Sequence, residues 1–106
     1  MTADAGAELE KAIRAAFATL AGTLRVEERV SRPWASITFS GERHRLRLGL
    51  GGGAGATAAA DAFLDGLSER EFNLRGHILA DIALLEERRE GDSLSLTLEA
   101  LTVEES

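Results

Sequence analysis

The chain has 106 residues, which is enough for one domain, and 44% of them are hydrophobic, a fraction that supports a single core. It contains no cysteine, which excludes a disulfide framework, a cysteine-ligated metal and a thiol nucleophile. The net charge of −6 disfavours a nucleic acid partner, because such proteins gain most of their affinity from a basic surface. With neither a secretory signal nor a long apolar run, we expect a soluble, cytoplasmic protein with no membrane contact.

The first predicted element is an amphipathic helix from Ala3 to Leu20. Asp4 is placed to cap its N-terminus, and Gly22 is placed to end it. The apolar residues recur at the spacing of one helix face, and they are Leu9, Ile13, Ala16, Phe17 and Leu20.

Three strands are predicted next, and the first runs from Leu24 to Val30. Glu28 falls on its apolar side, so either the strand ends there or a bulge turns the residue outward. Pro33 interrupts the pattern, because proline cannot donate a hydrogen bond to a sheet. A second strand follows from Trp34 to Ser40, and it places on one face Ala35, Ile37 and Phe39.

The third strand, Arg43 to Leu50, follows a tight turn at Gly41-Glu42 and has the clearest alternation in the chain. Its outward residues are basic, namely Arg43, Arg45 and Arg47. Its inward residues are His44, Leu46, Leu48 and Leu50.

A glycine-rich segment then precedes a short helix predicted from Thr57 to Leu67. The segment matches the G-x-G-x-x-A pattern of dinucleotide sites, in which glycines let the backbone approach a phosphate. A preceding antiparallel hairpin and the absence of a P-loop Lys-Ser/Thr pair favour a plain connector over an anion-binding loop. The candidate loop residues are Gly49, Gly51, Gly53 and Gly55.

The segment from His77 to Arg89 fits either a helix or a strand. We prefer a strand, because the turn Glu90-Gly91-Asp92 leads into a clear alternating strand from Leu94 to Ala100 that needs an antiparallel neighbour. The apolar phase then moves to Leu101 and Val103, which suggests a bulge or a twist.

The predicted fold class is therefore α+β, with the order α-β-β-β-α-β-β in a single domain over residues 1–106. One antiparallel sheet carries two helices on one face. This order is similar in topology to that of the acidic, dimeric secretion chaperones of bacteria. The similarity is one of topology only, because no sequence motif accompanies it, and fold alone does not define function.

The sequence shows no catalytic or metal-binding constellation. His44 and His77 lie far apart and lack the local spacing of a zinc site, so we interpret them as structural residues. The pairs Asp61/Asp65 and Glu86/Glu87 belong to solvated faces, and no nucleophile motif surrounds any serine. We therefore predict a protein that is not an enzyme and that uses no cofactor and no metal.

Two surfaces are candidates for binding. One is a stripe of outward arginines that suits an acidic peptide or another anion, formed by Arg43, Arg45 and Arg47 with Trp34 beside them, and extended by Arg25 and Arg29. A solvated sheet face balanced by Glu27 and Glu99 is the preferred explanation of this stripe. An apolar face predicted on the opposite side of the sheet from the helices suggests a homodimer through Leu79, Ala83, Leu85, Leu101 and Val103.

The preferred function is a non-catalytic interaction module that binds a protein or peptide, as a homodimer. The alternative is a small anionic-ligand binding protein or minor enzyme that uses the glycine loop and the arginine stripe. A converging pocket would favour the alternative, and a flat apolar face would favour the interaction module.

Overall fold

A computed structural model describes residues 4–17, 23–51, 54–91 and 93–105. The elements follow the order α1 (Ala5–Phe17), β1 (Thr23–Ala35), β2 (Ser40–Gly51), α2 (Ala54–Leu64), a short 3-10 turn (Leu67–Glu69), β3 (His77–Glu90) and β4 (Ser93–Glu104). The predicted α+β class with a single antiparallel sheet is confirmed. None of the helices in the described part of the chain has the length and apolar character of a membrane span.

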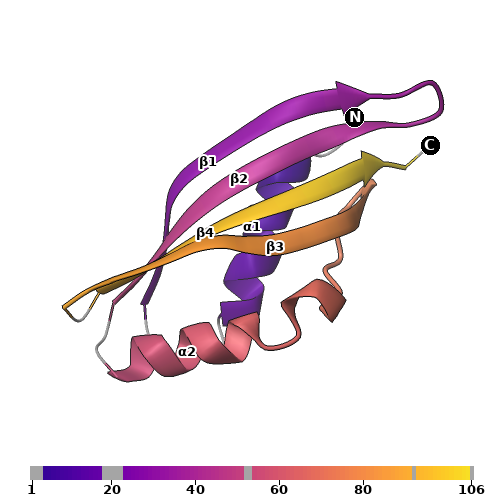
Figure 1. Ribbon diagram of the computed structural model, residues 1–106. Helices are drawn as coiled ribbons and strands as arrows, with labels where there is room; N and C mark the ends of the chain where they lie inside the picture. Colours follow the sequence, from indigo (N-terminus) through magenta and orange to yellow (C-terminus); the bar gives the residue numbers. More distant parts are fainter. Residues whose placement is uncertain (1–3, 18–22, 52–53, 92, 106) are drawn as a thin grey trace.

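The four strands form a sheet in the order β1-β2-β4-β3, and both helices cover one of its faces (Figure 1). The core lies between the helices and the two central strands, because β2 and β4 both present an unbroken row of apolar residues to the helices. Among its fully buried members are Leu9, Ile13, Leu46, Leu48, Leu96, Leu98 and Phe63. The strands are long, and the molecule is elongated, with extents of 46 × 24 × 22 Å.

The first predicted strand and the start of the second belong to one strand, β1, so the described residues before α2 form two strands and not three. β1 continues through Pro33 to Ala35, and the hairpin turn lies at residues 36–39 instead of at Gly41-Glu42. Proline is tolerated there because β1 is an edge strand, whose outer backbone groups need no partner in the sheet. The separate strand predicted from Trp34 to Ser40, with Ala35, Ile37 and Phe39 on one face, was wrong.

A β-bulge at Glu27 resolves the irregularity that the sequence shows at Glu28. The register shifts between Val26 and Glu28, so Glu28 turns outward and lies opposite Arg47. This confirms the bulge alternative. The same shift places Arg29 on the helix side of the sheet, opposite Leu46, so Arg29 does not extend the basic stripe.

The segment from His77 onward is the strand β3, as preferred from the sequence. Its alternation is interrupted twice, by register shifts between Leu79 and Asp81 and between Leu84 and Glu86. The register of β4, in contrast, has no shift, so the apolar residues change face at its end, as predicted, without the suggested bulge. Thr102 continues the inward row after Ala100, while Leu101 and Val103 face outward.

Polar side chains bind the free backbone groups at the N-terminus of α1 and at the C-terminus of α2. The backbone N–H of Gly6 donates to the Asp4 carboxylate at 2.9 Å, so Asp4 caps α1 as predicted. The second helix lies three residues earlier than predicted, because Gly66 adopts φ 67° and stops it. Arg70 then donates to the carbonyls of Ala62 and Phe63 at 3.1 and 3.2 Å, which satisfies the free carbonyls of the last turn.

Candidate interaction surface

The predicted arginine stripe lies on the face of the sheet opposite the helices. Arg43, Arg45 and Arg47 all point outward from β2 and are exposed. Their charges are balanced by carboxylates: Glu99 of β4 lies 3.3 Å from Arg43 and 3.2 Å from Arg45, and Glu28 of β1 lies 3.5 Å from Arg47. The structure therefore brings the stripe together, but as a row of ion pairs.

A shallow hollow of about 300 Å³ lies over this row. It combines the arginines Arg32, Arg43 and Arg45 with the carboxylates of Glu28 and Glu99. An anionic ligand that bound both Arg43 and Arg45 would have to displace Glu99 from their guanidinium groups. The hollow is thus a poor match for the anion-binding alternative.

Trp34 lies at the end of the arginine stripe, and a hydrogen bond from its side chain joins β1 to β4 across the intervening strand β2. It lies opposite Gly41 of β2, and its indole Nε1–H donates to the carbonyl oxygen of Thr102 at 3.2 Å. Gly41 has no side chain in the way, and an added Cβ would lie 1.9 Å from that same carbonyl oxygen. Trp34 is half-buried in this position, so it has a structural role as well as an exposed edge.

Apolar residues continue from Trp34 across the outer face at the same end of the sheet. Val103 of β4 lies opposite Gly41 of β2, and Ile78 of β3 lies opposite Val103. Ile78 is 54% exposed, and Val103 and Leu101 are half-buried. These residues form an apolar row that runs across all four strands next to the β1–β2 turn.

The predicted dimer face is only partly assembled by the fold. Ala83, Leu101 and Val103 do share the outer face. Leu79 lies on the helix side, packed against the core, because the bulge that follows it reverses the assumed phase. Leu85 lies at the second bulge and is exposed.

The predicted glycine loop is not a loop over most of its length. Gly49 and Gly51 belong to β2, opposite Arg25 and Thr23, and Gly55 lies inside α2. Gly53 lies outside the described residues. The glycines therefore do not converge on a phosphate-sized cradle among the residues that the structure describes.

His44 lies at the centre of a buried hydrogen-bonded network on the helix side of the sheet. Its Nδ1 lies 2.7 Å from Ser31 Oγ, and its Nε2 lies 2.9 Å from Thr102 Oγ1. Thr102 Oγ1 donates to the carbonyl of Glu42 at 3.3 Å, so we infer that it accepts from Nε2–H and that Ser31 donates to Nδ1. Burial lowers the pKa of His44, which favours this neutral form.

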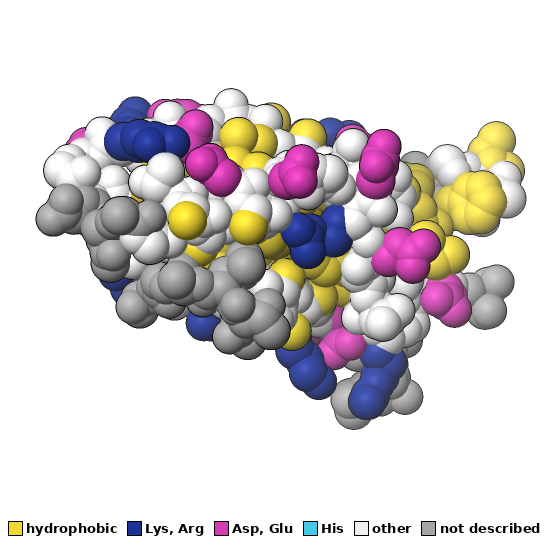
Figure 2. All heavy atoms as spheres, turned by 90° about the horizontal axis from the view of Figure 1, so that it is seen from below, with side chains coloured by type: hydrophobic (Ala, Val, Ile, Leu, Met, Phe, Trp, Pro, Cys, Tyr) yellow, Lys and Arg dark blue, Asp and Glu magenta, His cyan; other side chains and the backbone are white. Residues whose placement is uncertain are grey.

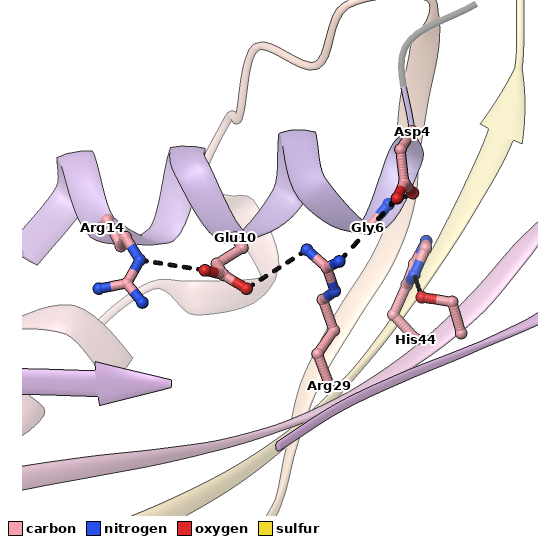
Figure 3. Close-up of polar contacts among 7 residues, drawn as sticks. Asp4, Gly6, Glu10, Arg14, Arg29 and His44 are labelled. Atoms are coloured by element: carbon pink, nitrogen blue, oxygen red, sulfur yellow. Dashed lines mark hydrogen bonds and ion pairs between the residues drawn. The ribbon is translucent and has the colours of Figure 1, made fainter. Parts of the chain in front are cut away.

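A second polar cluster joins α1 to β1 beside this network (Figure 3). Arg29 Nη1 lies 3.3 Å from the carboxylate of Glu10, and its Nη2 lies 3.9 Å from that of Asp4. Glu10 also pairs with Arg14 at 3.2 Å. These contacts hold the helix on the sheet, and we interpret both clusters as structural.

The titratable residues considered for catalysis remain dispersed. Asp61 is exposed on α2, and Asp65 is exposed directly after its end. Glu86 and Glu87 are exposed on β3, where they pair with Arg88 and Arg89. Within the described ranges no group of three or more histidine and carboxylate residues is placed to hold a metal ion.

The feature that the sequence analysis missed is the tip of the β1–β2 hairpin. Ile37 is fully exposed and Phe39 is 58% exposed, although both were predicted to lie on one face of a strand. Figure 2 shows apolar side chains gathered at the end of the molecule where Figure 1 places this turn.

Comparisons with known proteins add one structural likeness. No family model matches the chain, and no curated protein matches its sequence. Among solved structures, a chain of the "Virion of native gene transfer agent (GTA) particle" superposes with a TM-score of 0.64. The alignment covers 92% of this chain and 93% of that chain at 21% identity. The chain thus shares its fold, over nearly its whole length, with a component of a multi-protein particle.

Proposed function

We propose that the chain is a non-catalytic protein-interaction module that works within a larger protein assembly. The observation that carries this proposal is the exposure of large apolar residues at one end of the sheet, where Ile37 and Phe39 at the hairpin tip adjoin the outer-face row with Ile78. Water-exposed apolar groups gathered in this way usually mark an interaction site.

Two further observations support the proposal. The fold is shared with a chain of a gene transfer agent virion, which is itself an assembly of proteins. Arg43, Arg45 and Arg47 are already paired with Glu99 and Glu28, which favours a protein partner that meets a mixed, ion-paired surface over a small anion.

The experiment is an affinity purification of the tagged chain from its native cells. The wild type is compared with a triple variant, Ile37→Ser, Phe39→Ser and Ile78→Ser, whose changes fall on exposed positions. Leu85→Ser is the matched control, because Leu85 is a similarly exposed apolar residue on the other hairpin.

We expect a discrete protein to copurify in near-stoichiometric amount with the wild type and the control, and to be lost with the triple variant. Recovery of the chain free of other protein, or equal recovery of the partner with the triple variant, would contradict the proposal.

A further inference from the structure

The outer face of the sheet is free of any described element, because both helices lie on the other face (Figure 1). The strand register arranges its outward residues in rows that cross the sheet in the order β1-β2-β4-β3. The row nearest the β1–β2 turn is the apolar row, with Trp34, Gly41, Val103 and Ile78. The second row is Arg32, Arg43, Leu101 and Asp81, and the third is Val30, Arg45, Glu99 and Ala83.

The charges of these rows are divided between the two halves of the sheet. The β1–β2 half carries only basic residues, Arg32, Arg43 and Arg45, and the β4–β3 half carries only acidic ones, Glu99 and Asp81. Glu99 already pairs with Arg43 and Arg45 within the chain. Arg32 and Asp81 are exposed on opposite edge strands, and neither forms an ion pair with another described residue. The second row therefore ends in two unpaired charges of opposite sign.

We propose that two copies of the chain pack outer face against outer face around a twofold axis parallel to the strands, so that Arg32 of each copy meets Asp81 of the other. Rotation about this axis reverses the strand order, so β1 of one copy lies over β3 of the second copy, and β2 lies over β4. Both unpaired charges of each copy are then neutralised. This inference deepens the proposed function, on which it rests, by naming a second copy as a protein partner.

The apolar row also matches its own rotated copy. The indole of Trp34 reaches across β2 to the Thr102 carbonyl, so Trp34, Val103 and Ile78 form one strip. In the rotated copy the strip is reversed, and Trp34 faces Ile78, which is 54% exposed in the single chain. Because the indole N–H already has an acceptor, the ring can be covered without leaving a polar group unsatisfied.

The charges favour this arrangement over other face-to-face pairs. A twofold axis across the strands would place β2 over β2 and bring the arginines of both copies together, which is unfavourable. Moving the contact toward the other end of the sheet is also unfavourable, because Glu28 would then face Glu86, and Arg25 would face Arg88. Packed sheets are turned by about 30° relative to each other and separate away from their centre, so the contact can be limited to the first three rows.

The three rows define a small interface. Strands about 4.8 Å apart and rows about 6.8 Å apart give a footprint of roughly 19 × 20 Å on each copy. The two copies together bury on the order of 1,000 Å², which is at the low end of specific interfaces. We therefore expect a weak dimer, which forms at about 0.1 mM chain.

The experiment reverses the two unpaired charges in the purified full chain and measures its mass by light scattering from micromolar to millimolar concentration. The variants are Arg32→Asp, Asp81→Arg and the double variant with both changes. The matched controls are Lys11→Asp on α1 and Asp61→Arg on α2, exposed residues that form no ion pair within the described ranges and whose substitution changes the net charge equally. Circular dichroism verifies that each variant is folded.

We expect the wild type and both controls to rise above the monomer mass of 11.3 kDa as the concentration increases. Each single reversal places like charges together twice in the dimer, so it should raise the dissociation constant at least about tenfold. The double variant should dimerise as the wild type does, because the exchanged charges again meet as opposite pairs. An equimolar mixture of the two single variants should also dimerise, because both contacts of the mixed dimer join opposite charges.

A wild-type chain that stays monomeric overturns the inference, whether or not a different protein then binds the outer face. Dimerisation that either single reversal leaves unchanged also overturns it, as does a mixture of the single variants that stays monomeric. A chain that fails these tests but still copurifies from cells with a partner that depends on Ile37 and Phe39 retains the proposed function.

Discussion

Replacing Thr102 by valine tests the buried histidine network, because valine has nearly the same shape and lacks the hydroxyl. Thr102 Oγ1 makes two contacts, one with His44 Nε2 at 2.9 Å and one with the Glu42 carbonyl at 3.3 Å. Thr102 and His44 are both fully buried, so water cannot replace the lost partner. An unsatisfied buried polar group costs about 1–3 kcal/mol, a substantial part of the roughly 5–15 kcal/mol that stabilises a domain of this size.

Urea unfolding followed by circular dichroism measures this loss. We expect Thr102→Val to lower the midpoint at an unchanged slope, and to lower the melting temperature by about 5–15 °C. Thr97→Val is the matched control, because Thr97 lies on the outer face of the same strand and a surface change costs within about 0.5 kcal/mol. Equal stability of the two variants would refute the assignment of a stabilising network to His44.

Three further predictions follow from the core, the network and the hairpin. Burial lowers the pKa of His44 in the folded state, so the stability that neutral His44 contributes is complete above the unfolded pKa of 6.5 and is lost as the pH falls below 6.5. Thermal melts between pH 7 and 5 should show this loss in the wild type and less of it in His44→Gln. Phe63→Ala removes a fully buried ring stacked on Phe17 at 4.5 Å, so the free energy of unfolding should fall by about 3–5 kcal/mol in urea titrations, and a loss below 1 kcal/mol would contradict the packing. Gly41→Ala should lower the melting temperature more than Gly91→Ala, because only at Gly41 would a Cβ collide with the Thr102 carbonyl; the reverse order would show that the strands adjust freely.

Much of the fold was predictable where local signals agree. The alternation of β2 defined its inward and outward residues, and the charge at Glu28 marked the bulge of β1. The Asp4 cap was recognisable because capping depends on residues within one helical turn. The strand β3 was inferred correctly from its need for a partner beside β4.

The errors arose where the deciding contacts are distant in sequence or carry no marker residue. Pro33 suggested an interruption, but the edge position that tolerates it follows from the sheet order. The bulges at residues 80 and 85 contain no glycine, so the phase of β3 was assigned uniformly and Leu79 was placed on the wrong face.

The candidate surfaces were also predictable only in part. The outward direction of Arg43 and Arg45 was predictable from the alternation of β2, and Glu99 was named as a balancing charge. That Glu99 bridges both guanidinium groups was not predictable, because it depends on the pairing of β2 with β4, more than 50 residues away in the sequence. The apolar tip was missed because the turn at Ser36 and Phe39 lacks the residues by which hairpin turns are recognised.

The central claim is that protein covers the hairpin tip when the chain functions, and amide hydrogen exchange tests it most directly. The chain is measured dilute, at high concentration, and in complex with any partner purified from its cells, with the exposed end of β3 from Leu85 to Glu90 as an internal reference. The account predicts slower exchange of the tip, residues 36–40, in at least one of the two assembled states. Identical exchange of residues 36–40 in all three states would contradict it.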